Sequence, residues 1–363
     1  MSSPRPTGVA LEHNHLLARF WKAASHAWQE RRALAIGLAV FLIAVALLQL
    51  LMQVLLNLWN RNFFDALGRR DAHGLWIQAQ LFFPLAAGSV VLAATSVWGR
   101  MTAQRVWREA LTRHVLNRWL ERDRFHKVGR IAEGTENPEY RIAVDIRTST
   151  DAPIDLALAL FSSVVTSITF FGVLWTVGGN LDVMLFGRAV TIPGYLVLGV
   201  IIYSGIVTGL MIFTGHHMTG VIERMNQAEA EFRAAVDAFR GEDGKLVNGE
   251  KRASLWLKLK SVLYWWRALC WQLVRTTLVS SGNVLLAPVV AWILCAPKYL
   301  NGAMSLGELT QTAAAFVTVQ GAFNWLVDNY QRLADWRSSA HRLSTLLLAL
   351  DEVEAKEQAA AAS

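Results

Sequence analysis

Four carboxylates beside apolar stretches are the side chains of this 363-residue chain best placed to carry protons. Glu223, Glu229 and Glu231 follow directly after one charge-free stretch, and Asp328 follows directly after another. A carboxylate that faces a cavity between apolar helices has a raised pKa, because desolvation disfavours its charged form. Such a group binds and releases protons in a useful pH range. Glu229 and Glu231 are two residues apart and therefore face different sides of a helix.

The alternative interpretation of these carboxylates is a solvated helix face. Arg224 and Arg233 lie near enough along the chain to pair with Glu229 on one helix. Arg332 stands one helical turn after Asp328 and suits an ion pair at a helix end. The sequence therefore leaves both a proton-carrying and a purely structural role open.

Other chemistry is disfavoured by the residue patterns. The string Gly-Glu-Asp-Gly-Lys at 241–245 lacks the spacing of a phosphate-binding loop, and Leu246 stands where a Mg²⁺-binding hydroxyl is needed. His216 and His217 are adjacent, so on a helix they point about 100° apart and cannot chelate one ion. We expect no cofactor, no metal site and no enzyme activity.

These side chains must be positioned by membrane helices, because six long stretches contain no Asp, Glu, Lys or Arg. The stretches are 33–60, 72–99, 156–181, 189–222, 276–297 and 309–327. At about 1.5 Å of rise per residue, even the shortest spans roughly 28 Å as a helix, close to the thickness of a hydrocarbon core. We predict an all-α integral membrane protein with six transmembrane helices.

The distribution of positive charge predicts the orientation. The segments 1–32, 100–155, 223–275 and 328–363 hold 30 of the 35 Lys and Arg residues. Because basic residues accumulate on the cytoplasmic side, both termini and both long connections should be cytoplasmic. The net charge of +7 then has a topological cause and does not indicate a nucleic-acid partner.

The long cytoplasmic connections have the pattern of helices. Val106, Leu111, Val115 and Trp119 recur at helical spacing, which indicates that membrane helices continue into the cytoplasm. Each helix pair should then turn back at a short break, one of them at 241–249.

The chain ends are predicted separately from the six-helix domain 33–350. Phe20, Trp21 and Trp28 lie among basic residues in segment 1–32, which favours an amphipathic helix at the inner membrane interface over a disordered basic leader. Residues 351–363, rich in Glu and Ala, are expected to form a frayed tail.

Two strings resemble those of a known transporter family. The outer-end string resembles the L-N-x-W-N-R-D-F-Y-D-A-L run of YddA-like and subfamily D ABC transporters, and its matching residues include Asn57, Trp59, Asn60, Arg61 and Asp65. The second string resembles the family's N-P-D-Q-R-I…E-D-I-R motif and includes Asn137, Pro138, Arg141 and Asp145.

The resemblance implies an ABC exporter-type arrangement and roles for these residues. Segment 137–147 would form a coupling surface that rests on an ATPase, although Asn137 and Pro138 also suit an ordinary helix start. The segment around Glu229 resembles the family's E-A-D/E-F-R stretch, and the SbmA/BacA peptide-uptake transporters share the membrane architecture without an ATPase domain. The chain departs from the motif at Glu139 and Tyr140, and we expect it to contain no ATPase domain.

The expected function is transport across the bacterial inner membrane. Six helices are few for a wide translocation path, so we expect a homodimer embedded in the bilayer. The resemblance implies peptides or other bulky amphipathic substrates, with a proton gradient as one energy source. One alternative is an ABC permease served by a separate ATPase, and another is a membrane scaffold that transports nothing.

Overall fold

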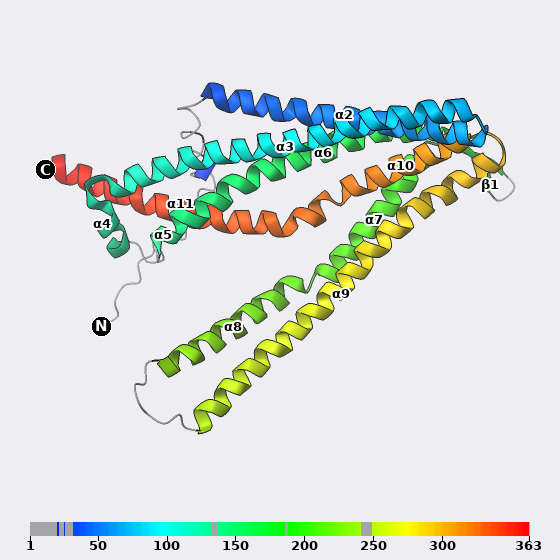
Figure 1. Cartoon of the computed structure of the whole chain (residues 1–363). Helices are drawn as coiled ribbons and strands as arrows, with labels where there is room; N and C mark the ends of the chain where they lie inside the picture. The colour runs from blue at the N-terminus through cyan, green and yellow to red at the C-terminus, as the bar shows by residue number, and fades with distance from the viewer. Residues whose placement is uncertain are drawn as a thin grey trace. The chain divides into compact units, whose positions relative to one another are not determined.

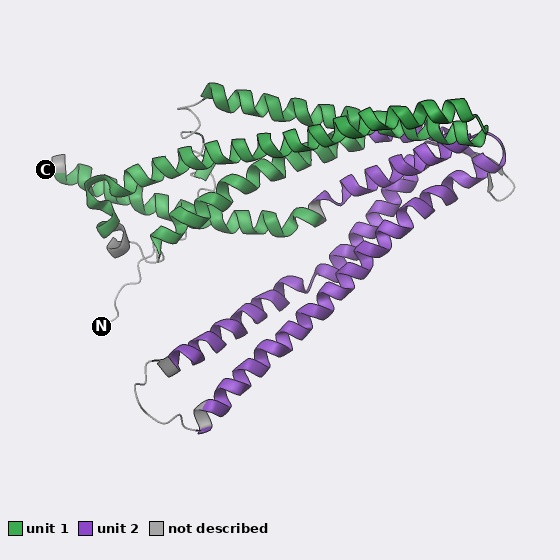
Figure 2. Ribbon diagram, viewed as in Figure 1, with its two compact units in different colours: residues 1–168, 328–363 green, residues 169–327 purple. Residues whose placement is uncertain are grey.

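The computed structural model describes residues 20, 21, 25, 32–131, 137–185, 188–240 and 249–362, which form helices and one β-hairpin (Figure 1). They divide into two compact units (Figure 2). Unit 1 holds residues 1–168 and 328–363, and unit 2 holds residues 169–327. Within the described residues, five helices are long and apolar enough to cross a membrane. The expected helical membrane protein is therefore confirmed.

Unit 1 is built on two long helices that pack side by side, α2 (Arg32–Gly68) and α3 (Ala72–Leu120) (Figure 1). Asp71 caps the start of α3, because its Oδ1 accepts a hydrogen bond of 3.0 Å from the Gly74 backbone N–H. The 49 residues of α3 extend roughly 73 Å, far more than a hydrocarbon core. This helix thus continues well beyond its charge-free stretch, as the apolar spacing predicts.

Shorter elements and one long helix complete unit 1. They are η1 (Glu121–Asp123), α4 (Arg124–Ile131), α5 (Pro138–Tyr140), η2 (Arg141–Asp145), the first part of α6 (Ile146–Gly178), and α11 (Trp325–Ala362) from Asp328 onward.

A buried apolar core joins α3, η2, α6 and α11. Its members include Trp107, Leu111, Val115, Ile142, Ile146, Ala340, Leu343, Leu346, Leu347, Leu350 and Val353. At about 25 cal/mol per Å² of buried apolar surface, burial of each large side chain contributes roughly 1.5–3 kcal/mol. The core therefore holds the C-terminal helix firmly against α3.

Unit 2 consists of the end of α6, a β-hairpin and four helices. These are β1 (Asn180–Leu185), β2 (Arg188–Pro193), α7 (Tyr195–Gly215), α8 (Met218–Arg240), α9 (Gly249–Leu300) and α10 (Leu306–Phe323). α9 packs on α7, α8 and α10. A Ser305–Glu308 capping box begins α10.

The β-hairpin corrects the expectation for two charge-free stretches. β1 and β2 pair antiparallel with Asn180 opposite Pro193, so α6 ends at Gly178 and α7 begins at Tyr195. Gly194 has φ +59°, and a Cβ there would lie 2.3 Å from the Trp175 ring, so glycine suits this corner. The beginning of the stretch 189–222 is therefore a strand.

The sixth stretch is interrupted. α10 ends at Phe323, and α11 begins after Asn324. α10 is not among the five candidate spans found in the described residues, because Gln311, Gln320 and several threonines lower its hydropathy. The count of six spans thus stays a prediction.

The chain ends differ from their expected form where they are described. Phe20 is fully buried in the unit 1 core, and Trp21 stacks on Trp107 with ring centroids 6.4 Å apart. These two rings thus pack on protein, whereas most of segment 1–32, including Trp28, lies outside the described residues. At the other end, α11 continues as a helix to Ala362, and no fraying from residue 352 is seen.

Candidate functional site

Charged side chains attach α11 to the rest of unit 1 at three levels, and this attachment is the candidate functional site. The three levels involve α3 and α6, then η2, then α3 and α4. All participating residues belong to unit 1. They connect α11 to segments more than 170 positions earlier in the chain.

At the first level, Asp155 of α6 is the common partner of three side chains. It is 8% exposed and lies 3.3 Å from Nε of Arg100 on α3. The Gln104 amide donates a hydrogen bond of 2.8 Å to its Oδ1, and Arg332 of α11 pairs with its Oδ2. The expected Asp328–Arg332 pair is therefore replaced by an Asp155–Arg332 pair.

At the second level, the turn η2 is fixed to α11. Asp145 is fully buried and binds Arg342 through two hydrogen bonds of 2.6 and 2.9 Å. Arg141 donates to the Arg342 carbonyl at 3.1 Å and to Oγ1 of Thr345 at 2.6 Å. Removing one partner of a buried ion pair typically costs roughly 3–5 kcal/mol, so these contacts define where the turn sits on α11.

At the third level, basic residues of α3 and α4 clasp the acidic end of α11. Arg118 binds Asp351 and Glu354, at 2.6 and 2.9 Å. Arg124, Lys127 and Glu357 complete the cluster, with Glu357 bound by Arg124 at 3.0 Å and by Lys127 at 2.7 Å. The hydrogen bond from Lys127 lowers the pKa of Glu357 below its ordinary value, with Arg124 contributing in the same direction.

The predicted coupling residues divide into two kinds. Arg141 and Asp145 point into the unit and bind α11, as described above. Asn137 stands at the start of α5 with Pro138 in the first helical position. The Asn137 carbonyl accepts the Tyr140 backbone N–H at 3.1 Å, but its side chain makes no capping hydrogen bond. The expected side-chain cap is therefore wrong, whereas the expected helix start is present.

The outer-end string joins α2 to α3. Trp59 donates from Nε1 to the Gln78 carbonyl at 2.7 Å and packs against Phe63 and Phe82. Arg61 and Asp65 form an i,i+4 pair at 3.9 Å. The remaining members of the string are Asn57, which is buried, and Asn60, which is half-buried. The geometry gives this string a structural role at the α2–α3 turn.

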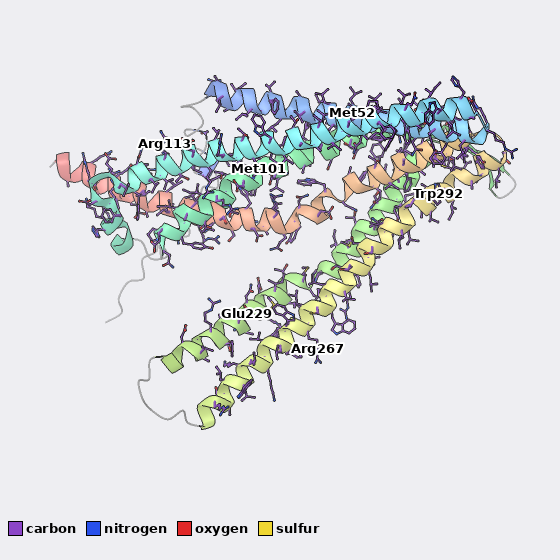
Figure 3. The ribbon with its side chains drawn as sticks, in the orientation of Figure 1. Met52, Met101, Arg113, Glu229, Arg267 and Trp292 are labelled. Atoms are coloured by element: carbon purple, nitrogen blue, oxygen red, sulfur yellow. The ribbon has the colours of Figure 1, made fainter. Side chains whose placement is uncertain are left out.

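The carboxylates of α8 lie in unit 2, with Glu229 on the shaft of the helix (Figure 3). Glu231 forms an ion pair with Lys258 of α9 at 2.5 Å, which favours its charged form. Glu229 is half-buried and Glu223 is exposed. Arg224, an expected partner of Glu229, instead lies 5.0 Å above the Trp265 ring.

The Asp155 cluster is the part of the site that sequence reasoning missed. Asp155 and Arg100 each border a charge-free stretch, at 156–181 and 72–99 respectively. Arg332 follows the stretch 309–327 by one helical turn. Opposite charges at the same ends of several spans indicate an ion pair at the membrane boundary, and this signal was available in the sequence.

Comparison with known proteins assigns a family to this helical membrane protein. The model for ABC transporter transmembrane region 2 matches residues 27–241, which is more than half of the chain. The chain therefore belongs to the family of ABC transporter transmembrane regions. The expected resemblance to YddA-like and subfamily D transporters is confirmed.

Three relatives show how much of a longer protein this family region represents. The chain is 28% identical to the inner membrane ABC transporter ATP-binding protein YddA of Escherichia coli, over 90% of this chain and 58% of that protein. It is 24% identical to ABC transporter D family member 2, chloroplastic, of Arabidopsis thaliana, over 92% of this chain and 46% of that protein. An uncharacterized ABC transporter ATP-binding protein of Haemophilus influenzae is 20% identical over 96% of this chain and 59% of its own length. The chain thus spans less than two thirds of these relatives.

Proposed function

We propose that this chain is the membrane-spanning half of a homodimeric inner-membrane transporter for peptides or other bulky amphipathic molecules. Its family supports a transporter subunit in the membrane. Its proposed arrangement is six transmembrane helices of the ABC exporter type, with α10 as the least apolar span. The observation that carries the proposal is the attachment of the turn at Arg141–Asp145 to α11.

The attachment suits a transporter because it connects a cytoplasmic turn to a helix that continues from a membrane stretch. Asp145 and Arg342 form a buried pair with little freedom to slide, so a displacement of the turn moves α11 with it. α11 follows α10 after a single interrupted residue, Asn324. A scaffold without transport has no need for a rigid connection of this kind.

Two energy sources are open to such a transporter. An ATPase that rests on segment 137–147 would push the turn, and the names of the relatives, which include ATP-binding proteins, favour this source. A proton gradient would instead act through a carboxylate that changes its protonation state. Glu229 suits that role better than Glu231, because Glu231 already has a lysine partner.

Transport in proteoliposomes tests the function. Purified chain is reconstituted, and uptake of labelled peptides is measured with an imposed proton gradient, and separately with ATP and candidate ATPases. Uptake above protein-free vesicles under either condition supports the proposal. Uptake under neither condition, with a panel of peptides and ATPases, favours the scaffold.

Two further parts of the proposal have direct tests. The polypeptide described here should neither bind nor hydrolyse ATP by itself, because the string at 241–245 does not have the spacing of a phosphate loop. For topology, a cysteine introduced beside Arg69 should react with an impermeant thiol reagent from outside the cell, and one beside Arg118 should not. The reverse labelling pattern would place the termini on the other side.

A further inference from the structure

A polar pocket lies within unit 1, between three helices that carry charge-free stretches. Its volume is about 340 Å³, and α2, α3 and α6 line it. The polar members of its lining are Gln49, Gln53, Ser89, Ser162 and Thr166. Met52, labelled in Figure 3 on α2, is among its apolar members.

The depth of this pocket makes its polarity informative. Gln53 and Gln49 stand 7 and 11 residues before the nearer end of the stretch 33–60, which corresponds to roughly 10–17 Å of helix. At that depth, a polar group without a hydrogen-bonding partner costs several kcal/mol in contact with lipid. The pocket is large enough for a small-molecule ligand or for several waters. Two amides and three hydroxyls at this depth therefore indicate water or a polar ligand.

The chemistry of the lining defines the ligand. None of the residues that line the pocket is ionisable, so a charged group would find no compensating charge there. Glutamine amides both donate and accept hydrogen bonds, as do the hydroxyls of serine and threonine. The lining thus suits an uncharged group that also donates and accepts, such as an amide or a hydroxyl.

A second pocket next to the first extends the argument. It has a volume of about 300 Å³ and shares Phe161 with the polar pocket. Its lining is almost entirely apolar and includes Leu38, Leu42, Ile43 and Leu158. A ligand that occupies both pockets would place an uncharged polar group beside an apolar one.

We propose that these two pockets bind an uncharged amphipathic ligand, with its amide or hydroxyl group against Gln53 and Gln49 and its apolar part against Leu42 and Leu158. This assignment rests on the proposed function only for the expectation that the ligand is transported. Binding itself is tested without transport, so failure of one leaves the other standing.

Thiol labelling in proteoliposomes tests the polar pocket. Cys270 and Cys295 are first replaced by alanine, and then Gln53→Cys is compared with Leu51→Cys, an exposed position outside both pocket linings. A cationic methanethiosulfonate reacts with thiolates in water and reaches lipid-facing thiols poorly. We expect the cysteine at position 53 to react at least ten times faster than the one at position 51. Equal rates would show that the pocket holds no water and would overturn the proposal.

Ligand protection tests the chemistry, with N-lauroyl-glycinamide as the uncharged amphipathic probe. It should slow labelling at position 53 at least threefold, whereas N-lauroyl-glycine, which carries a carboxylate, and tetradecane should have little effect. Protection by either of these two equal to that of the amide would overturn the assignment. Ser162→Cys, with Val164→Cys as its exposed control, repeats both measurements from α6 and guards against misfolding at position 53.

Discussion

The cytoplasmic part of unit 1 and the α8–α9 hairpin of unit 2 use similar sequences in different ways. Around α11, apolar side chains form a shared core, and charged residues pair across long stretches of the chain. In the α8–α9 hairpin, large apolar side chains remain exposed, among them Trp256, Leu257, Leu263, Tyr264 and Trp266. An apolar surface of this extent on a soluble segment indicates a partner. The comparison teaches that unit 1 is complete by itself there, whereas the hairpin of unit 2 is not.

The position of these exposed side chains along α9 argues against lipid as their partner. Trp256 and Leu257 stand about 20 residues before the stretch 276–297, which is roughly 30 Å of helix. Under the predicted topology they lie well below the membrane surface. A second copy of the chain is the partner that the proposed homodimer provides.

The largest expected effect comes from breaking the buried pair of unit 1. Arg342→Ala leaves the Asp145 carboxylate fully buried without its partner, which should cost roughly 3–5 kcal/mol. The thermal unfolding midpoint in detergent should fall by on the order of 10 °C. Arg337→Ala, at an exposed position of the same helix, is the control and should leave the midpoint nearly unchanged. If both variants unfold at the same temperature as the parent chain, the pair does not hold α11.

The next effect concerns the hairpin of unit 2. Leu257→Glu places a charge on an apolar side chain that is 65% exposed, so it should weaken the dimer without unfolding the chain. Light scattering after size-exclusion chromatography should show a shift from dimer to monomer. Trp271→Ser, five residues before the membrane stretch, is the matched control, because its ring would lie at the level of the lipid headgroups. A dimer that survives Leu257→Glu would mean that another surface joins the two copies.

A third test separates a functional carboxylate of unit 2 from its neighbours. If a proton gradient drives transport, Glu229→Gln should reduce uptake at least tenfold, because the amide keeps size and hydrogen bonding but cannot titrate. Glu223→Gln removes an exposed carboxylate of the same helix and should transport normally. Expression and dimer formation should be unchanged in both. Normal uptake by Glu229→Gln at every pH tested would remove this residue from the mechanism and favour an ATP-driven transporter.

The helices were predictable from the sequence because charge-free length measures the capacity to cross a membrane directly. The same measure does not distinguish a strand from a helix, so it missed the hairpin before Tyr195. The β-branched residues Val190, Thr191 and Ile192, followed by Pro193 and Gly194, carry a strand signal that a search for turns would have found.

The partners within the site were less predictable than the helices. Arg141 and Asp145 were identified by a motif, but their partners on α11 lie about 200 positions later, and nothing local in the sequence specifies that pairing. Arg332 was assigned to Asp328 because an i,i+4 neighbour is visible in the sequence. It binds Asp155 instead, because tertiary packing brings a more buried carboxylate within reach.

The smallest effect expected in unit 1 is a pH dependence at the end of α11. The pKa of Glu357 is lowered in the folded chain, first by its hydrogen bond with Lys127 and then by Arg124. A carboxylate with a lowered folded-state pKa contributes stability above its unfolded pKa of about 4.3, and this contribution is lost as the pH falls through the folded-state value. Glu357→Gln should therefore lower the unfolding midpoint at pH 7, and the difference from the parent chain should vanish as the pH is lowered below about 4. The variant Glu352→Gln changes an exposed carboxylate of the same helix and should show no such trend. A difference between Glu357→Gln and the parent chain that persists unchanged at low pH would assign the effect to lost packing, because only the charged form of Glu357 gains from Lys127 and Arg124.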